Sequence, residues 1–166
     1  MLISKPRRIL ITGVPATGKT TIGNFLKEKF NFIHFDVESS DANYNTSFLG
    51  KLFWELKIDE FLNQVIRGSG NVVITWGFVC DHQRSLDIIN ALQEKGFEFI
   101  WFNAEEPVAR CAFLERGTGD VRDFDIQMER IKKLDLSIFN NPTIITTIDK
   151  NGRKNKDEII KEIIKK

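Results

Sequence analysis

Residues 13–20 read Gly-Val-Pro-Ala-Thr-Gly-Lys-Thr, and they follow directly on the apolar stretch Arg8–Thr12. This is the pattern Gly-x-x-x-x-Gly-Lys-Thr, in which the glycines permit the backbone angles that turn successive N–H groups toward an anion. The lysine supplies a positive charge for the β- and γ-phosphates of a nucleoside triphosphate, and the threonine hydroxyl is a ligand for Mg²⁺. The sequence therefore predicts a phosphate-binding loop between a strand and a helix.

We expect this loop and the first turn of the helix after it to hold the nucleotide. The N–H groups and the dipole of the helix N-terminus favour the same anion. The predicted cofactors are therefore ATP and Mg²⁺, with GTP as an alternative donor and with Thr20 as a ligand of the metal. The predicted nucleotide-binding residues are Gly13, Pro15, Ala16, Thr17, Gly18, Lys19, Thr20 and Thr21.

Five short apolar runs alternate with longer amphipathic stretches along the chain. Interiors such as Ile9-Leu10-Ile11 and Val72-Val73-Ile74 are apolar at every position, which indicates strands of a parallel sheet that is covered on both faces. The intervening stretches have apolar residues at helical spacing. This alternation predicts an α/β fold with three layers, α/β/α, and a five-stranded parallel sheet. The predicted strands are Arg8–Thr12, Phe32–Asp36, Asn71–Trp76, Phe97–Asn103 and Thr143–Ile148.

Two stretches interrupt this alternation. Residues 37–70 are too long for a simple crossover, and we expect them to form a helical insertion with helices around Leu49–Leu56 and Ile58–Ile66. Residues 116–125 are polar and contain two glycines between two helical patterns, which predicts a short lid. The chain shows neither an internal repeat nor a linker, so we expect a single domain over residues 1–166.

Charge and composition exclude several classes of partner. The formal net charge is +1, from 24 basic and 23 acidic residues, which favours neither nucleic acid nor a membrane surface. No apolar run approaches the roughly 20 residues of a spanning helix. The first eight residues lack the apolar stretch of a secretion signal, and Cys80 and Cys111 fit reduced core cysteines. We therefore expect a cytoplasmic protein that is a monomer or a weak dimer.

Absent motifs narrow the class of nucleotide-binding protein. A GTPase needs Asp-x-x-Gly after its third strand, whereas the single match here, Asp149–Gly152, follows the fifth. An ATPase motor needs an apolar run that ends in Asp-Glu, and none of the predicted strands ends in this way.

The layout that remains resembles the small P-loop kinases, such as adenylate kinase, shikimate kinase and gluconate kinase. Trp76-Gly77-Phe78, with Gln83 farther on, is similar to the Asp-Gly-Phe-Pro-Arg stretch of adenylate kinases, with tryptophan in place of the aspartate. Glu115-Arg116-Gly117 resembles the start of their lid, although Ala112 stands where an arginine is usual. The resemblance implies the strand order 2-3-1-4-5, and it places the adenine base near residues 149–153.

Asp36-Val37-Glu38 ends the second predicted strand, where shikimate kinase and its relatives carry an Asp-x-Asp linked to Mg²⁺ and the acceptor. Residues two apart on a strand point to the same side, so both carboxylates can face the γ-phosphate. The resemblance makes Asp36 a candidate catalytic residue and metal ligand. A turn aspartate beside a solvated glutamate is the alternative interpretation.

Arginines in the predicted lid have a physical role in phosphoryl transfer, which depends on positioning and on neutralising the charge of the transferred group. Arg116 and Arg122 are the candidates, and with Lys19 and Asp36 they complete the predicted catalytic set. As the alternative, lid arginines can be solvated or pair with neighbouring aspartates. For His34 and His82 we expect core or surface roles.

Together these features predict ATP- and Mg²⁺-dependent phosphoryl transfer to a small-molecule acceptor. The similarity to adenylate kinases favours a nucleotide or nucleoside acceptor over a sugar acid or a shikimate-type alcohol. A regulatory protein that binds the nucleotide without transferring phosphate is the alternative from another class. Neither nucleic acid nor a membrane is an expected partner.

Overall fold

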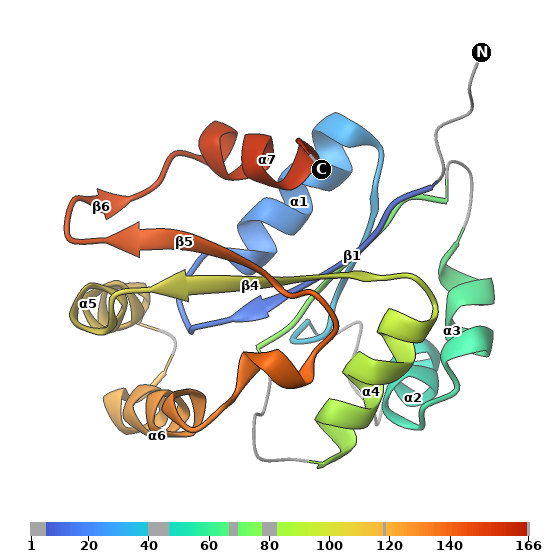
Figure 1. The fold of residues 1–166 in the computed structure, drawn as a ribbon, viewed down its shortest axis with the longest axis horizontal. Helices are drawn as coiled ribbons and strands as arrows, with labels where there is room; N and C mark the ends of the chain where they lie inside the picture. Colours follow the sequence, from blue (N-terminus) through green and yellow to red (C-terminus); the bar gives the residue numbers. More distant parts are fainter. Residues whose placement is uncertain (1–5, 40–46, 67–69, 78–82, 118, 166) are drawn as a thin grey trace.

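The computed structural model describes residues 6–39, 47–66, 70–77, 83–117 and 119–165. A sheet runs through the middle of the molecule, and helices cover both of its faces (Figure 1). The strands are β1 (Arg8–Gly13), β2 (Ile33–Asp36), β3 (Val72–Thr75), β4 (Glu98–Ala104), β5 (Thr143–Asp149) and β6 (Gly152–Arg153). The helices are α1 (Lys19–Phe30), α2 (Phe48–Trp54), α3 (Ile58–Val65), α4 (Gln83–Glu94), α5 (Glu106–Arg116), α6 (Val121–Lys132) and α7 (Lys156–Ile164), with a 3₁₀ turn, η2 (Leu136–Ile138).

The strand order is β2-β3-β1-β4-β5-β6. The first five strands are parallel to one another, so the predicted order 2-3-1-4-5 is confirmed, and each predicted strand is present with ends shifted by at most one residue. The sixth strand was not predicted. It is antiparallel to β5 and only two residues long, which is too short for a periodic pattern to reveal it.

Alternate residues of the central strands serve two separate cores. Ile9 and Ile11 of β1 pack with α1 and α7, whereas Leu10 packs with α2, α3 and α4 on the opposite face. Figure 1 shows α1 and α7 above the sheet and α4 and α6 below it. Because both faces are covered, the central strands are apolar throughout, as a buried parallel sheet requires.

The predicted insertion forms α2 and α3, whose aromatic side chains lie in the core. Phe53 and Phe61 are fully buried. Trp76, just after β3, is 2% exposed and stands edge-on to Phe53 and Trp54, with ring centroids 5.5 and 5.3 Å apart. The large aromatic after β3 is therefore a packing residue. Among the other residues named above, Phe78, Cys80 and His82 lie outside the described ranges, and Cys111 on α5 is exposed rather than in the core.

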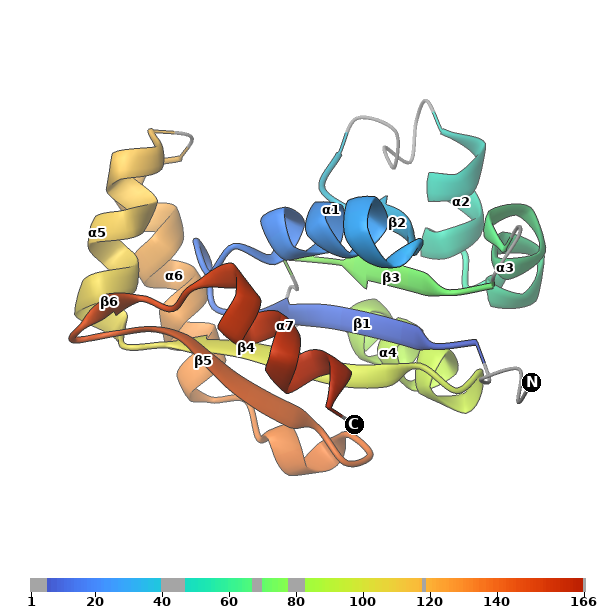
Figure 2. The same ribbon diagram turned by 90° about the horizontal axis from the view of Figure 1, so that it is seen from above.

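The stretch predicted as a lid divides between two helices and the turn that joins them. α5 ends at Arg116 with Gly117 as its left-handed C-cap, and α6 begins at Val121 with the Asp120 side chain as its N-cap. Figure 2 shows α5 and α6 side by side near the carboxyl end of β4.

Among the described helices, none has both the length and the apolarity that crossing a bilayer requires.

Gly13 marks the point where β1 leaves the sheet and passes against β4. Its φ is +129°, and a Cβ atom there would overlap the backbone of Phe102. The next residue, Val14, donates its N–H to the Phe102 carbonyl at 2.9 Å. The close approach of two backbones therefore excludes every side chain at position 13.

We expect Gly13→Ala to lower the free energy of unfolding by about 2 kcal/mol or more, because it adds a backbone clash to an unfavourable φ. Urea denaturation measures this change. Gly96→Asn is the matched control, since Gly96 also has a positive φ of +83° but has no atom within 4 Å of a Cβ. That control should cost less than about 1 kcal/mol, because asparagine tolerates left-handed backbone. Equal losses in the two variants would contradict the proposed backbone contact.

Candidate active site

The loop between β1 and α1 is held in an irregular backbone conformation. Ala16 and Gly18 have φ values of +63° and +84°. The Thr17 hydroxyl donates to the Val14 carbonyl at 2.7 Å, which closes the loop from within. Gly18 precedes the first residue of α1, so the loop ends at the N-terminus of a helix, where unpaired N–H groups favour anions.

Lys19 lies inside the loop with only 8% of its surface exposed. Its Nζ donates to the Val14 carbonyl at 2.9 Å. Burial lowers the pKa of Lys19 to about 8; Arg116 also lowers it, while the negative charges of Glu38 and Asp36 oppose the change. A buried ammonium group with this perturbed pKa gains from an anion beside it, as bound phosphate would provide.

Thr20 meets Asp36 across the space between α1 and β2. The Thr20 hydroxyl donates to Oδ2 of Asp36 at 2.9 Å, while Oδ1 accepts the backbone N–H of Glu38 at 3.1 Å. A threonine hydroxyl beside a carboxylate fits Mg²⁺, which commonly takes one or two protein ligands and completes its shell with phosphate oxygens and water. In the described part of the chain, no group of three or more His, Cys, Asp or Glu residues is placed to hold a metal.

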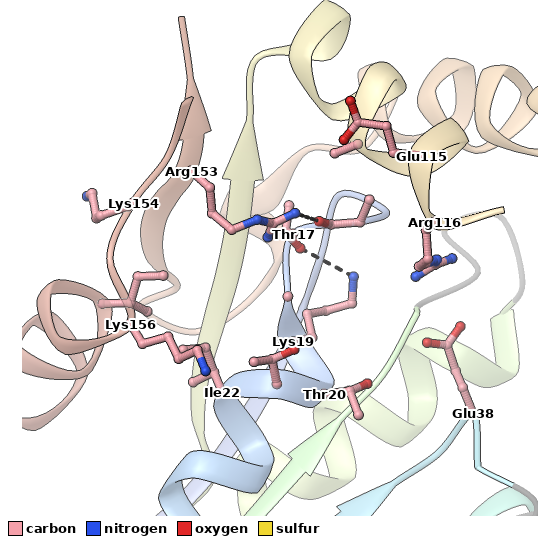
Figure 3. A pocket seen from close by; sticks show the side chains of 15 residues that line it. Thr17, Lys19, Thr20, Ile22, Glu38, Glu115, Arg116, Arg153, Lys154 and Lys156 are labelled. Carbon is pink, nitrogen blue, oxygen red and sulfur yellow. Dashed lines mark hydrogen bonds between the residues drawn. The ribbon is translucent and has the colours of Figure 1, made fainter. Parts of the chain in front are cut away.

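A cavity of about 530 Å³ opens beside the loop and is lined by residues from elements that are far apart in the sequence (Figure 3). Glu38, after β2, and Arg116, at the end of α5, both line it, and Figure 3 shows them on the side of the cavity near Lys19 and Thr20. The full lining is Ala16, Thr17, Gly18, Lys19, Thr20, Thr21, Ile22, Glu38, Ala112, Glu115, Arg116, Arg153, Lys154, Lys156 and Ile159.

The two predicted lid arginines lie in different places. Arg116 lines the cavity, with its guanidinium carbon 5.2 Å from the ring centroid of Phe113. Arg122 lies in the first turn of α6, is exposed, and is not among the residues that line the cavity. Arg110 of α5, which lies outside the predicted lid, binds Asp125 of α6 at 3.1 Å. The structure therefore brings one of the two arginines to the loop.

Arg153 is a residue of the site that no motif in the sequence predicts individually. It lies on β6 and reaches the loop, where its Nη2 donates to the Ala16 carbonyl at 2.8 Å. β5 makes a second contact, since the Thr147 hydroxyl donates to the Thr17 carbonyl at 3.2 Å. The resemblance had pointed to residues 149–153 only as a region near the adenine base. No local pattern links Arg153 to a loop that lies 137 residues away.

His34 is held by hydrogen bonds on both sides of its ring. Nδ1 lies 2.9 Å from Oδ1 of Asn24, and Nε2 lies 2.8 Å from Oγ1 of Thr75. Burial lowers the pKa of His34, with Asp36 acting in the opposite direction. The ring therefore joins α1 and β3 to β2 by hydrogen bonds, two residues before Asp36.

Comparison of the sequence with protein-family models and with curated proteins finds no match. Comparison with solved structures does. A gluconokinase from Sinorhizobium meliloti 1021 matches 96% of this chain and 90% of its own, with a TM-score of 0.63 at 14% identity. This chain has the small P-loop kinase fold.

Two other solved structures share this fold over almost their full length. A shikimate kinase from Bacteroides thetaiotaomicron matches 96% of this chain and 99% of its own, with a TM-score of 0.59 and 18% identity. A tunicamycin resistance protein from Deinococcus radiodurans matches 97% of this chain and 95% of its own, with a TM-score of 0.63 and 15% identity. The resemblance to small P-loop kinases is confirmed at the level of the fold.

We expect Arg153→Ala to weaken binding of ADP or ATP by about tenfold. The loop loses an anchor and the cavity loses a positive charge, and a hydrogen bond to a charged group contributes about 1.5 kcal/mol. Isothermal titration calorimetry measures this change. Lys150→Ala is the matched control, since Lys150 is exposed in the same hairpin but does not line the cavity. If both variants bind nucleotide like the parent protein, Arg153 has no part in the site.

Proposed function

We propose that this protein is an ATP- and Mg²⁺-dependent kinase that transfers the γ-phosphoryl group to a hydroxyl of a small molecule. The observation that carries the proposal is the hydrogen bond between Thr20 and Asp36, made beside the buried Lys19 and in reach of the cavity that Glu38 and Arg116 line. The kinase fold of the gluconokinase and shikimate kinase structures supports this class of reaction.

On the donor side each residue has a defined task. The backbone of residues 13–18 and Lys19 hold the phosphates, and Thr20 and Asp36 would hold Mg²⁺, which offsets the charge of the phosphate oxygens. Arg116 lies where a cation can neutralise the transferred group. Arg153 adds a positive charge from the β5–β6 hairpin. The role of Arg122 stays a prediction.

The position of Glu38 favours a hydroxyl group of the acceptor as the nucleophile. Its carboxylate lies against the backbone of Gly77, after β3, and it lines the same cavity as Lys19. A carboxylate in this place can accept the proton that a hydroxyl loses as its oxygen bonds to phosphorus. A nucleoside monophosphate is already anionic, so it needs cations more than it needs a base.

The positions of the cations in the cavity distinguish hydroxyl acceptors from nucleotide acceptors. Of the cations that line the cavity, Arg153, Lys154 and Lys156 come from β6, from the residues after it and from α7, next to the loop, whereas Arg116 lies on the same side as Glu38. We therefore place a nucleoside, a sugar acid or a shikimate-type alcohol, each with a free hydroxyl, ahead of a nucleotide. We also propose a cytoplasmic location, a monomer or weak dimer, and no nucleic-acid partner.

A screen of phosphate transfer from Mg·ATP tests the proposal. The panel holds nucleosides, sugar acids, cyclic alcohols and nucleoside monophosphates, and formation of ADP and of the phosphorylated acceptor is measured together. Turnover with a hydroxyl compound is the expected result. Turnover with monophosphates alone would overturn the hydroxyl acceptor. Tight ATP binding without any turnover would instead favour the regulatory nucleotide-binding protein.

We expect Asp36→Asn and Glu38→Gln each to lower kcat by about 100-fold or more, because positioned metal and proton-transfer groups contribute at least this much. The two variants should differ in binding. Asp36→Asn raises the Mg²⁺ concentration that half-saturates the enzyme, whereas Glu38→Gln leaves it unchanged. A kcat within about threefold of the parent value in either variant would remove that residue from the chemistry.

Arg116→Ala should lower kcat by about 100-fold, because it removes a cation from the side of the transferred phosphoryl group. Arg122→Ala is the comparison variant, and from its position outside the cavity we expect a change of less than about threefold. Steady-state kinetics at saturating Mg·ATP measure both values. Equal losses would show that α6 brings Arg122 to the phosphates during turnover, as the sequence predicts for a lid.

A further inference from the structure

Two contacts join α1 to β2 along one face of each element. Thr20 and Asn24 are four residues apart on α1, so they lie one above the other on the same face of the helix. His34 and Asp36 are two residues apart on β2, so they point to the same side of the strand. Thr20 binds Asp36, and one turn along the helix Asn24 binds His34.

The His34 ring connects three elements at once. Its Nδ1 is paired with Asn24 of α1, and its Nε2 is paired with the hydroxyl of Thr75, the last residue of β3. Thr75 is 1% exposed, so its side chain is fixed by packing. Thr75 also stands next to Asp36 in the register of the sheet, and its carbonyl accepts the N–H of Val37 at 3.0 Å.

The ring also sets how closely the helix lies to the strand. A Cβ atom at Gly23, on the face of α1 that meets β2, would overlap the His34 ring. The imidazole therefore occupies space that a side chain of α1 would otherwise fill. Because packed interiors leave little free volume, the ring acts as a spacer of defined thickness between α1 and β2.

β2 gains from such an anchor because it is a short strand at the edge of the sheet. It has four residues, it lies at the edge of the sheet, and within the described residues β3 is its one partner strand. Asp36 is its last residue, so the end of an edge strand carries the carboxylate that meets Thr20. A fixed point two residues earlier limits how far that carboxylate can move.

We propose that His34 is a positioning residue for Asp36: through Asn24 and Thr75 it fixes the separation of α1 and β2 and so keeps the Asp36 carboxylate on the Thr20 hydroxyl. The inference rests on the proposed function, in which this pair holds Mg²⁺. A core or surface role, which is what the sequence predicts for His34, would affect stability without affecting the metal.

Binding of Mg²⁺ distinguishes the two roles. His34→Phe keeps a ring between α1 and β2 and removes both hydrogen bonds. Isothermal titration calorimetry with a non-hydrolysable ATP analogue, in EDTA and across a range of Mg²⁺ concentrations, separates nucleotide affinity from metal affinity. We expect the half-saturating Mg²⁺ concentration to rise about tenfold, as is typical when a residue that orients a metal ligand is lost. Affinity for the analogue in EDTA should stay within about twofold.

Phe35→Leu is the matched control on the same strand. Phe35 points to the opposite face, where its ring packs against Phe53 and Phe61. It should lower the melting temperature and leave the Mg²⁺ requirement unchanged. Asn24→Ala is a second test variant, because it removes a single hydrogen bond from an exposed position of α1 and keeps the imidazole in place. We expect it to raise the Mg²⁺ requirement by about threefold.

A double-mutant cycle with Asp36→Asn completes the test. If His34 acts through Asp36, His34→Phe should have no further effect on Mg²⁺ binding once the carboxylate is gone. Unchanged Mg²⁺ binding in folded His34→Phe and Asn24→Ala, with a raised requirement in Asp36→Asn, would overturn the inference and leave the proposed function intact. Unchanged binding in Asp36→Asn as well would overturn the metal role of Asp36 and the inference with it.

Discussion

Carbonyl groups of the phosphate loop are bound by donors from the protein itself, some inside the loop and some from the β5–β6 region, and the rest of the site depends on this constraint. The Ala16 carbonyl accepts from Arg153, and the Thr17 carbonyl accepts from Thr147. The Val14 carbonyl accepts from both Thr17 and Lys19. Because each peptide unit points its N–H opposite to its carbonyl, tying the carbonyls in this way leaves N–H groups for an anion. These contacts within the protein fix the shape of the loop.

The parallel sheet brings the charged partners of this loop together. The order β2-β3-β1-β4-β5 reverses direction at β1, and ligands of α/β proteins bind at such a point, beyond the carboxyl ends of the strands. Asp36 comes from the end of β2, and Arg153 comes from the hairpin after β5. Opposite charges therefore meet the loop from its two flanks, with the buried Lys19 between them.

The side of the site next to β2 and β3 differs from the loop in how it is stabilised. Trp76 and Phe53 form part of an aromatic core beneath it. Asp36 binds Thr20, and a second set of hydrogen bonds, from Asn24 to His34 to Thr75, joins the same helix and strand one turn farther on. An apolar core supplies stability without direction, whereas hydrogen bonds fix orientation. This division lets the strand end carry a carboxylate in a defined place.

Local patterns in the sequence determined much of the fold. The Gly13–Thr20 motif and the five apolar strands could be predicted because each depends on neighbouring residues, whereas the strand order came from the resemblance to small P-loop kinases. The motif and the resemblance together also pointed to Thr20 and Asp36 as candidate metal ligands. These features need no knowledge of distant contacts.

Tertiary structure alone decided which other side chains reach the loop. Arg153 lies 137 residues from Ala16, and β6, which carries it, is too short to give a pattern. Arg116 lines the cavity while Arg122 does not, because the turn between α5 and α6 sets where each helix begins and ends. His34 joins Asn24 and Thr75 only once α1, β2 and β3 are packed. Spacing along the chain predicts which residues share a face, but packing decides what that face meets.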